Sequence, residues 1–257
     1  MNIALLTDFG TKDYFVGAMK GVILQINEKA NIIDITHEIE PQNVLAAGFT
    51  LGACYKNFPK KTIFAAVVDP GVGSERRAIL VEAEDYFFIS PDNGLLSFLY
   101  NHQEHFRVIE ITNKKYFNRP VSKTFHGRDI FAPCAAHLSN GVSPSEFGNV
   151  IFDFVKVNET KPRKINEYLL EAEVIYTDRF GNLITNLTEK DLPQKFYLEI
   201  NQLKIKQQRD YFAEAENDEV FMIFGSAGFL EIAAFQNSAK KLLNAENGAK
   251  IKVFSEN

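Results

Sequence analysis

The sequence lacks tryptophan, has only two cysteines and carries no excess of basic residues. Its 28 Lys and Arg are outnumbered by 33 Asp and Glu, giving a formal net charge of −5, so the basic surface typical of nonspecific DNA or RNA binding is not expected. No apolar run approaches the length of about 18 residues that a membrane helix needs. The first residues, MNIALLTDFG, lack the basic start and apolar segment of a secretion signal. We therefore expect a cytoplasmic protein that binds neither nucleic acid nor membranes.

What the sequence does contain is ample apolar mass. Hydrophobic residues make up 46% and charged residues 24% of the 257 residues, with 23 phenylalanines, which is typical of a globular protein. This length corresponds to one large domain or two small ones. Cys54 and Cys134 lie in apolar, helix-like stretches, which favours two buried free thiols over a disulfide or a metal pair.

The first half of the chain alternates strand and helix patterns. Apolar runs predict strands at residues 3–7, 31–35, 62–68, 78–83, 86–89 and 106–111. Helical spacing predicts helices at 14–26 with Asp13 as N-cap, from Pro41 to about residue 55, shortly after Gly94, and at 129–138 with Asp129 as N-cap. This alternation predicts an α/β domain at residues 1–157, with a mostly parallel sheet covered by helices on both faces.

The pattern changes after a polar segment. Residues 158–167 are charged and contain Pro162, as expected of a linker. Beyond it, short strand patterns occur at 169–176, 183–187, 196–200, 220–224, 229–234 and 251–254, with one helix at 237–243. We expect residues 168–257 to form a smaller β-rich barrel or sandwich.

Acidic residues follow several predicted strands. Asp8, Asp34, Asp69 and Asp92 lie at or just past the carboxyl ends of these strands, the edge where open α/β sheets bind ligands. Each one alone is explained by the preference of Asp for turns and caps. Together, and interleaved with glycines, they indicate a site.

Two dense polar segments add to this edge, at residues 69–77 and 122–131. The first is no dinucleotide loop, because Arg76 stands where a third glycine is required, and no Walker pattern occurs. Asp-Phe-Gly at residues 8–10 comes too early in the chain for a kinase. In the second, His126 beside Gly127 precedes a helix, a position open to a cleft.

Four side chains are candidates for a metal site. An oxygen and nitrogen ligand set is conceivable from Asp8, His37, Asp69 and His126. The usual ligand spacings HExxH and HxH and a close pair of cysteines do not occur. We therefore expect no metal and no other cofactor.

Seven motifs, taken in order, resemble one family. They are Thr7-Asp8-Phe9-Gly10, Asp34-Ile35-Thr36-His37, Val68-Asp69-Pro70-Gly71-Val72-Gly73, Pro91-Asp92-Asn93-Gly94, Phe125-His126-Gly127-Arg128-Asp129, Asp178-Arg179-Phe180-Gly181-Asn182 and Gly225-Ser226-Ala227-Gly228-Phe229-Leu230-Glu231-Ile232. Over nearly the whole chain this pattern is similar to the S-adenosylmethionine hydroxide adenosyltransferases, relatives of the fluorinase and chlorinase. The resemblance implies hydrolysis of S-adenosylmethionine to adenosine and methionine. It also implies a homotrimer, with each site between one subunit's N-terminal domain and a neighbour's C-terminal domain.

The resemblance also implies roles for single residues. The water-activating trio corresponds to Asp69, Arg76 and His126. The substrate-binding positions correspond to Asp8 for the ribose hydroxyls, Phe125 for the wall of the reacting centre, Asp178 and Ser226 for the methionine amine and carboxylate, Asn182 for adenine, and Phe212 for stacking on adenine.

Three alternatives stay open at this point, and one of them is a metal-dependent hydrolase. A halogenase is the first, although halogenating relatives carry Tyr in place of Asp69, and the fluorinase carries Tyr-Ser in place of His126-Gly127. The second is a protein that binds S-adenosylmethionine or a nucleoside without turnover. The sequence departs from the fluorinase at Ala227, where that enzyme has Arg, so carboxylate binding here would depend more on Ser226 and the main chain.

Overall fold

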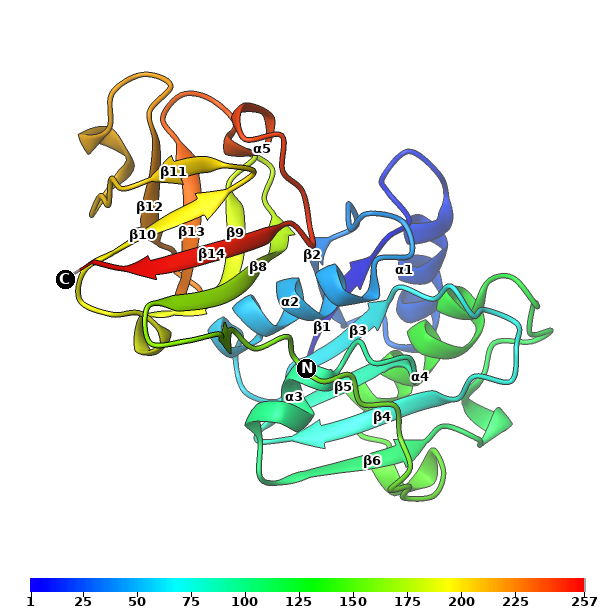
Figure 1. Ribbon diagram of the computed structural model, residues 1–257. Helices are drawn as coiled ribbons and strands as arrows, with labels where there is room; N and C mark the ends of the chain where they lie inside the picture. Colours follow the sequence, from blue (N-terminus) through cyan, green and yellow to red (C-terminus); the bar gives the residue numbers. More distant parts are fainter. Residues whose placement is uncertain (257) are drawn as a thin grey trace. The chain divides into compact units, whose positions relative to one another are not determined.

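The computed structural model describes residues 1–256, and the chain divides into two units, Met1–Glu159 and a second that begins at Thr160. Each unit has its own sheet (Figure 1). Each also has its own hydrophobic core. The predicted fold class, an α/β sheet followed by a β-rich part, is confirmed. Within residues 1–256, the helices are all too short or too polar to cross a membrane.

The first unit is built on a six-stranded sheet of order β2-β1-β3-β5-β4-β6. Its strands are β1 (Asn2–Thr7), β2 (Asn31–Thr36), β3 (Ile63–Val67), β4 (Ala78–Ala83), β5 (Tyr86–Pro91) and β6 (Phe106–Glu110). β1 pairs in parallel with β2 and β3, and β3 with β5, whereas β4 runs antiparallel to both its neighbours. The chain places β2 on one side of β1 and then β3 on the other. The β1–β3 pair is therefore a topological switch point, where α/β sheets bind ligands.

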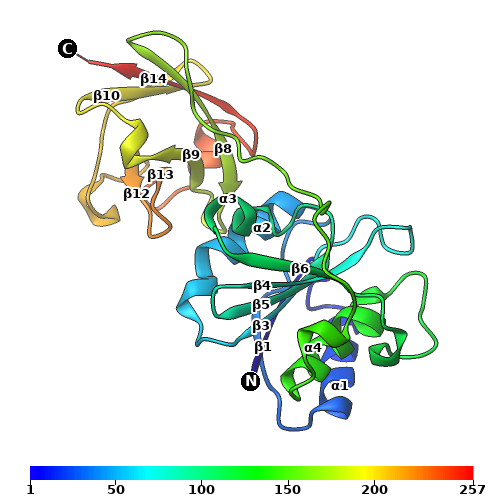
Figure 2. The ribbon, with the colours of Figure 1, turned by 90° about the horizontal axis from the view of Figure 1, so that it is seen from below.

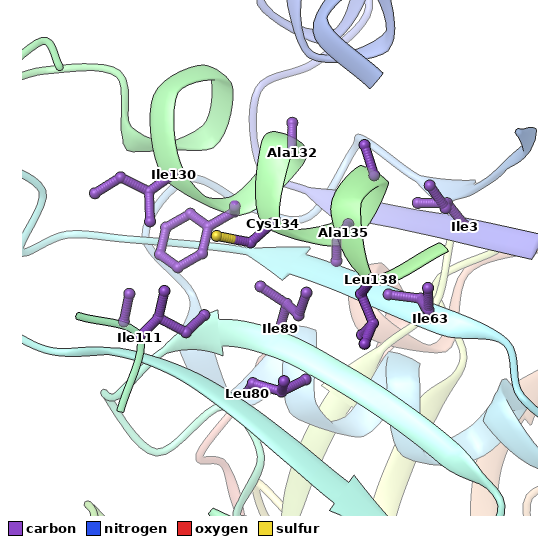
Figure 3. Packing of buried hydrophobic residues seen from close by; sticks show 14 of the residues in the cluster. Ile3, Ile63, Leu80, Ile89, Ile111, Ile130, Ala132, Cys134, Ala135 and Leu138 are labelled. Atoms are coloured by element: carbon purple, nitrogen blue, oxygen red, sulfur yellow. The ribbon is translucent and has the colours of Figure 1, made fainter. Parts of the chain in front are cut away.

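Helices cover both faces of this sheet. α1 (Phe15–Ile26) and α4 (Ala132–Ser139) pack together on one face, and α2 (Val44–Cys54) and α3 (Ser97–His102) on the other (Figure 2). Under α1 and α4, side chains that alternate along each strand form one core with Cys134 at its centre (Figure 3). The opposite face is aromatic: the rings of Phe64 and Phe88 stack at 5.1 Å between centroids, edge-on to Tyr55. This cluster accounts for part of the high phenylalanine content.

The predicted starts of two helices are wrong. α1 begins at Phe15 after Tyr14, and no side chain caps it, so Asp13 is not an N-cap. α2 begins at Val44, and Oδ1 of Asn43 accepts the main-chain N–H of Ala46 at 3.0 Å. Pro41 lies outside the helix because Gln42 adopts a left-handed conformation (φ 68°) that interrupts the helix before it can form.

The second unit is one strongly curved antiparallel sheet with the path β11-β10-β14-β8-β9-β13-β12 and with β7 beside β8. Its strands are β7 (Arg163–Lys164), β8 (Leu169–Thr177), β9 (Leu183–Thr188), β10 (Phe196–Ile200), β11 (Leu203–Ile205), β12 (Val220–Phe224), β13 (Phe229–Ala234) and β14 (Lys250–Ser255), with α5 at Ala239–Leu242. A bridge between Gln208, just after β11, and Met222 in β12 brings the two ends of the path together. The sheet is thus nearly a closed barrel around an aliphatic core.

Both cysteines are free and lie on helices, Cys54 in α2 and Cys134 in α4. Cys134 is buried as predicted, and burial raises its pKa. Cys54 is only partly buried.

Candidate active site

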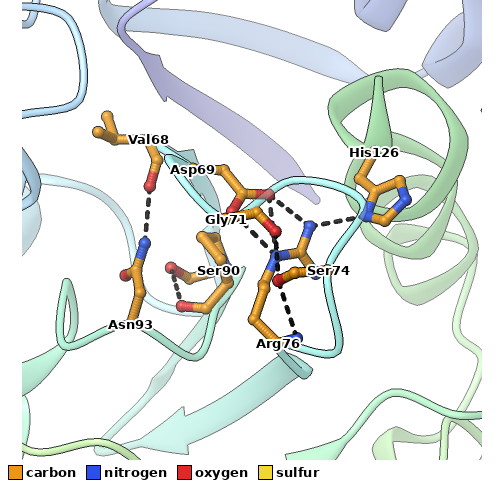
Figure 4. A network of polar contacts seen from close by, with 9 residues as sticks. Val68, Asp69, Gly71, Ser74, Arg76, Ser90, Asn93 and His126 are labelled. Carbon is orange, nitrogen blue, oxygen red and sulfur yellow. Dashed lines mark hydrogen bonds and ion pairs between the residues drawn. The ribbon is translucent and has the colours of Figure 1, made fainter. Parts of the chain in front are cut away.

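The carboxyl edge of the parallel strands gathers the predicted acidic loops of the first unit. Thr7 at the end of β1 lies opposite Val67 at the end of β3, so Asp8 and Asp69 leave the sheet at the same edge. After β5, Asn93 donates a hydrogen bond from Nδ2 to the carbonyl of Val68 at 2.8 Å (Figure 4). This bond ties the third loop of the edge to the strand that carries Asp69.

Asp69, Arg76 and His126 form one hydrogen-bonded chain (Figure 4). Nε of Arg76 lies 2.9 Å from each carboxylate oxygen of Asp69, and Nη2 also donates to Oδ2. The same Nη2 donates to Nδ1 of His126 at 2.7 Å. The Asp69 and Arg76 side chains are only 5% and 11% exposed, so this ion pair is well shielded from water. The structure therefore brings together the three residues predicted as the catalytic trio.

The contact with Arg76 determines the state of the His126 ring. A guanidinium has no acceptor and does not lose a proton in proteins, so Nδ1 of His126 must present its lone pair to Arg76. Burial first, and then the positive charge of Arg76, lower the pKa of His126 below its usual 6.5, against the opposing effects of Asp69, Asp129 and a hydrogen bond to the Ser122 main chain. At neutral pH the ring is therefore uncharged, with its proton on Nε2.

Glycines allow the loop after β3 to reach the segment before α4. Gly73 has φ 80°, and a Cβ there would lie 2.2 Å from the carbonyl oxygen of Lys123. Only glycine fits such a close approach of two main chains. Ser74 stabilises the turn, because its Oγ donates to the carbonyl of Gly71 at 2.7 Å. The loop therefore presents Arg76 directly to His126.

Asp129 is not the helix N-cap that the sequence predicts, but supports a neighbouring segment of the chain. The predicted helix at 129–138 is in fact a π-helical turn, Gly127–Phe131, followed by α4, and π-helical turns are frequent at functional sites. Asp129 is 0% exposed and accepts the main-chain N–H of Ser122 at 2.8 Å while pairing with Arg128. Burial alone would raise the pKa of Asp129, but the bonds from Arg128 and Ser122 outweigh it and lower the pKa. The carboxylate thus fixes the segment that precedes His126.

Asp8 is partly buried in the loop after β1, and its Oδ2 accepts the main-chain N–H of Gln42 at 2.8 Å. Within residues 1–256, Oδ1 has no hydrogen-bond partner. Asp34 does not belong with the strand-end acids, because β2 continues to Thr36 and Asp34 contacts Lys20 and His37 instead. Asp92 lies at the edge but pairs with Arg77 at 2.7 Å. Of the four acids, Asp8 and Asp69 keep a carboxylate available to the edge.

Phe125 is 6% exposed and lies in an aromatic cluster next to the trio. Its ring packs against Phe9 at 5.9 Å and Phe15 at 5.1 Å between centroids, and the guanidinium of Arg128 lies over it. Gly127 packs against the same rings, since a Cβ there would lie 3.1 Å from Phe9 and 3.2 Å from Phe125. Phe125 and Gly127, which belong to this apolar cluster, are the residues directly before and after His126 in the sequence.

In the second unit, Asp178 and Asn182 shape the turn between β8 and β9. Oδ1 of Asp178 accepts the main-chain N–H groups of Phe180 and Asn182, at 2.9 and 2.8 Å, and Oδ2 accepts Nδ2 of Asn182 at 2.8 Å. Gly181 completes the turn with φ 85°. The structure brings these two predicted residues into direct contact.

The remaining two predicted residues of this unit lie apart from that pair in the chain. Ser226 is exposed in the turn Gly225–Gly228 between β12 and β13. Phe212 is 43% exposed in a short helical turn, edge-on to Phe221 at 5.8 Å between ring centroids.

One acidic residue of this unit received no role from the sequence. A Cβ on Gly225 would overlap Oε1 of Glu231, so the carboxylate of Glu231 covers the start of the Ser226 turn. Burial first, and then the negative charge of Asp178, raise the pKa of Glu231. Glu231 falls at a half-buried strand position, and only its place in the last quoted motif marks it in the sequence.

Cation ligands of the usual kind do not cluster in the part of the chain that is described: residues 1–256 contain no group of three or more His, Cys, Asp or Glu arranged to hold a metal ion.

Comparison with known proteins identifies the family of the chain. Residues 3–148 match the SAM hydroxide adenosyltransferase N-terminal domain, and residues 172–252 match the corresponding C-terminal domain. The chain belongs to the SAM hydroxide adenosyltransferase family. The resemblance read from the seven motifs is thereby confirmed.

Relatives within the family carry one recurring name. A protein of Methanocaldococcus jannaschii named (R)-S-adenosyl-L-methionine hydrolase is 38% identical, with 95% of this chain and 92% of the relative covered. A Thermus thermophilus protein of the same name is 31% identical, with 98% of each chain covered. A fluorinase of an Actinoplanes species is more distant, at 27% identity over 74% of this chain and 72% of that protein.

Solved structures agree with the sequence comparison. The crystal structure of a Thermotoga maritima protein, described as an uncharacterized conserved protein, superposes with a TM-score of 0.90 at 36% identity, covering 98% of this chain and 100% of the other. The fold of this family member is therefore shared across its whole length.

Proposed function

We propose that this protein hydrolyses S-adenosyl-L-methionine to adenosine and L-methionine. Water attacks C5′ of the ribose, the C5′–S bond breaks with its electron pair going to sulfur, and one proton is released. Membership of the family and the name shared by its full-length relatives support this reaction. The observation that carries it is the shielded chain of Asp69, Arg76 and His126 at the carboxyl edge of the sheet.

The chemistry suits a charged, desolvated site. The substrate sulfur is a sulfonium cation and leaves as a neutral thioether, so attack by a hydroxide-like oxygen annihilates charge, and low polarity favours that step. Bulk water has a pKa of about 15.7, so its proton must move as the new bond forms. Holding the water in line with the breaking bond contributes further.

The hydrogen bonds divide the roles within the trio. The Nδ1 lone pair of His126 is occupied by Arg76, so in this arrangement the ring does not accept a proton. Asp69 is the carboxylate of the trio, and within residues 1–256 its Oδ1 accepts a hydrogen bond only from Nε of Arg76, which leaves a second lone pair on that oxygen. We assign the proton acceptor to Asp69, stabilisation of hydroxide-like character to Arg76, and orientation of Arg76 to His126.

Substrate binding is assigned to the two remaining groups of residues. In the first unit, the unpartnered Oδ1 of Asp8 suits the ribose hydroxyls, because bonds from hydroxyls to a carboxylate are strong. Phe125 supplies an apolar wall beside His126. In the second unit, Asp178 and Ser226 are assigned to the methionine amine and carboxylate, and Asn182 and Phe212 to adenine.

The names of the relatives also suggest which stereoisomer is consumed. Both full-length relatives are named for (R)-S-adenosyl-L-methionine, in which the configuration at sulfur is R. We propose that the (R)-sulfonium is the preferred substrate here. Separate assays of the two sulfur epimers test this, and a higher kcat/KM for the S epimer would contradict it.

The assembly and surroundings of the enzyme are further proposals. Because the family resemblance implies it, we propose a homotrimer in the cytoplasm, acting without a cofactor and without nucleic acid or membrane partners. Light scattering on the purified protein tests the trimer. Activity that persists in excess EDTA would support metal independence, and loss restored by a divalent ion would contradict it.

Isotope labelling tests the reaction itself. The purified protein is incubated with S-adenosylmethionine in oxygen-18 water, and we expect adenosine with one heavy oxygen at C5′ together with unlabelled methionine. A parallel incubation with chloride or fluoride in large excess over the protein distinguishes the halogenase, which would form the 5′-halogenated nucleoside. Binding without any product would indicate the non-catalytic alternative.

Mutants test the division of roles. Asp69→Asn keeps the shape of the side chain but removes its charge, and we expect a larger loss of kcat than in His126→Asn. Because the three residues act as one chain, the double variant should lose little more than Asp69→Asn alone. Fully multiplicative losses would contradict the assignment.

A further inference from the structure

A second hydrogen-bonded chain in the first unit lies behind Asp8. His37, just after β2, has a side chain only 3% exposed. Its Nδ1 lies 2.9 Å from Oγ1 of Thr7, the last residue of β1. Its Nε2 lies 3.0 Å from Oδ1 of Asp34, at an angle too poor for a full hydrogen bond. The ring thus lies between a hydroxyl and a carboxylate.

The carboxylate determines which way the hydroxyl points. Burial would raise the pKa of Asp34, but the contacts with Lys20 and His37 outweigh it and lower the pKa, so Asp34 is charged. In the tautomer of His37 that carries its proton on Nε2, the nitrogen nearer to this carboxylate, Nδ1 is the acceptor. The hydroxyl of Thr7 then donates to Nδ1 and keeps its lone pairs for the main-chain N–H of Phe9, 3.3 Å away.

The main chain of His37 supports the same loop at its other end. The N–H of Gly10 donates to the carbonyl of His37 at 2.7 Å, and Gly10 has a left-handed φ of 67°. His37 therefore contacts the residue before Asp8 and the turn after Phe9. The two residues between these contacts are Asp8, whose Oδ2 accepts from Gln42, and Phe9, which packs on Phe125.

We propose that His37 is a positioning residue, which acts through Thr7 to aim the Asp8 carboxylate at the ribose hydroxyls of the substrate. This inference deepens the proposed function and rests on it. His37 and Thr7 are separate from the catalytic trio. No hydrogen bond within residues 1–256 joins them to Asp69, Arg76 or His126. Their loss should therefore weaken ribose recognition more than the chemical step.

The test compares two nucleosides that differ only in those hydroxyls. Adenosine and 2′,3′-dideoxyadenosine are titrated calorimetrically into the full-length protein. A hydrogen bond to a carboxylate is strong enough that wild type should prefer adenosine by about tenfold or more. Asp8→Asn serves as the reference for lost hydroxyl recognition.

Thr7→Val and His37→Leu each remove one partner of the hydrogen bond between Thr7 and His37. We expect each to reduce the preference for adenosine to within about threefold, by weakening adenosine binding while dideoxyadenosine binds as before. KM for S-adenosylmethionine should rise by about tenfold while kcat changes by less than about threefold. Because both residues act through one bond, the double variant should resemble the single ones.

Conservative variants distinguish positioning from mere support of the fold. Thr7→Ser keeps the hydroxyl, and His37→Asn keeps a polar group at the place of Nδ1, so both should retain most of the wild-type preference. If His37→Leu does not fold, Thr7→Val decides, because it only exchanges a hydroxyl for a methyl group.

The failures are distinguishable. Should Thr7→Val keep the full wild-type preference while Asp8→Asn loses it, the positioning role is wrong and the proposed function stands. An equal loss of affinity for both nucleosides in Thr7→Val would also overturn the role. If wild type bound neither nucleoside and did not consume S-adenosylmethionine, both proposals would fall.

Discussion

The acids of the two units are held in opposite ways. In the first unit, Asp69 is bound by Arg76, which in turn contacts His126, 50 residues further along the chain. In the second unit, Asp178 is bound by its own turn, through groups two and four residues away. The first arrangement exists only when the fold is complete, whereas the second is built into a local turn. Substitutions of Asp69 and its partners should therefore affect chemistry, whereas substitutions of Asp178 should affect binding or local order.

The contrast extends to two adjacent arginines. Arg76 turns to the shielded trio, whereas Arg77 holds the buried carboxylate of Asp92 and also pairs with Asp153. Asp92 in turn accepts the main-chain N–H of Val155 at 2.8 Å. Neighbouring residues on one loop thus belong to two different networks, the proposed catalytic trio and the contacts that attach a distant segment.

The largest effect should come from Arg76. Arg76→Ala removes the cation that bridges Asp69 and His126, and we expect kcat to fall by about a thousandfold, the scale seen when a stabilising donor is lost from an active site. Steady-state kinetics with S-adenosylmethionine measures it. Arg76→Lys should restore little, because one ammonium cannot reproduce the fork of contacts. A loss below about tenfold would remove Arg76 from the chemistry.

The next effect is on stability. Arg77→Ala leaves the Asp92 carboxylate, whose side chain is 2% exposed, without its main partner. We expect the free energy of unfolding to fall by about 2 to 3 kcal/mol, measured by urea denaturation. The kcat of the folded fraction should change little. If Arg77→Ala and Arg76→Ala lost activity and stability alike, the contrast between the two arginines would be wrong.

A smaller effect is expected in the second unit. Asp178→Asn keeps an acceptor for the turn but removes the charge assigned to the methionine amine, so KM should rise by about tenfold with kcat nearly unchanged. Arg179→Gln, an exposed neighbour, is the matched control and should behave like wild type. A fall in kcat as large as that of Arg76→Ala would contradict the contrast between Asp69 and Asp178.

The smallest effect concerns pH. Because the folded protein lowers the pKa of His126 below 6.5, the unfolded chain binds that proton more readily, and the free energy of unfolding should fall as the pH drops below 6.5. His137, whose pKa is also lowered by burial, adds to the same slope. His126→Asn should flatten the dependence between pH 7.5 and 5.5 in part, and His137→Asn should remove the remainder. A slope unchanged in His126→Asn would contradict a neutral ring in the trio.

Several features could be predicted because they depend on neighbours in the chain. Strand periodicity, the turn glycines and the order of the motifs indicated the α/β sheet, the β-rich part and the family. Helix starts were less predictable, because the local preferences for caps and first turns fit more than one residue. Asp13 suits the cap of α1, and both Pro41 and Asn43 suit the start of α2. The bond from the Gln42 main chain to Asp8, 34 residues away, accompanies the actual start of α2.

The amino-acid sequence by itself therefore determined which elements form and which residue types reach the carboxyl edge of the sheet. Only the tertiary structure decided that Arg76 joins Asp69 to His126, that Asp129 supports the Ser122 segment, and that Glu231 covers the Ser226 turn. The physical reason is the range of the interactions. Main-chain periodicity and turn chemistry act over a few residues, whereas the partner of a buried charge is selected by packing between segments that are distant in the chain.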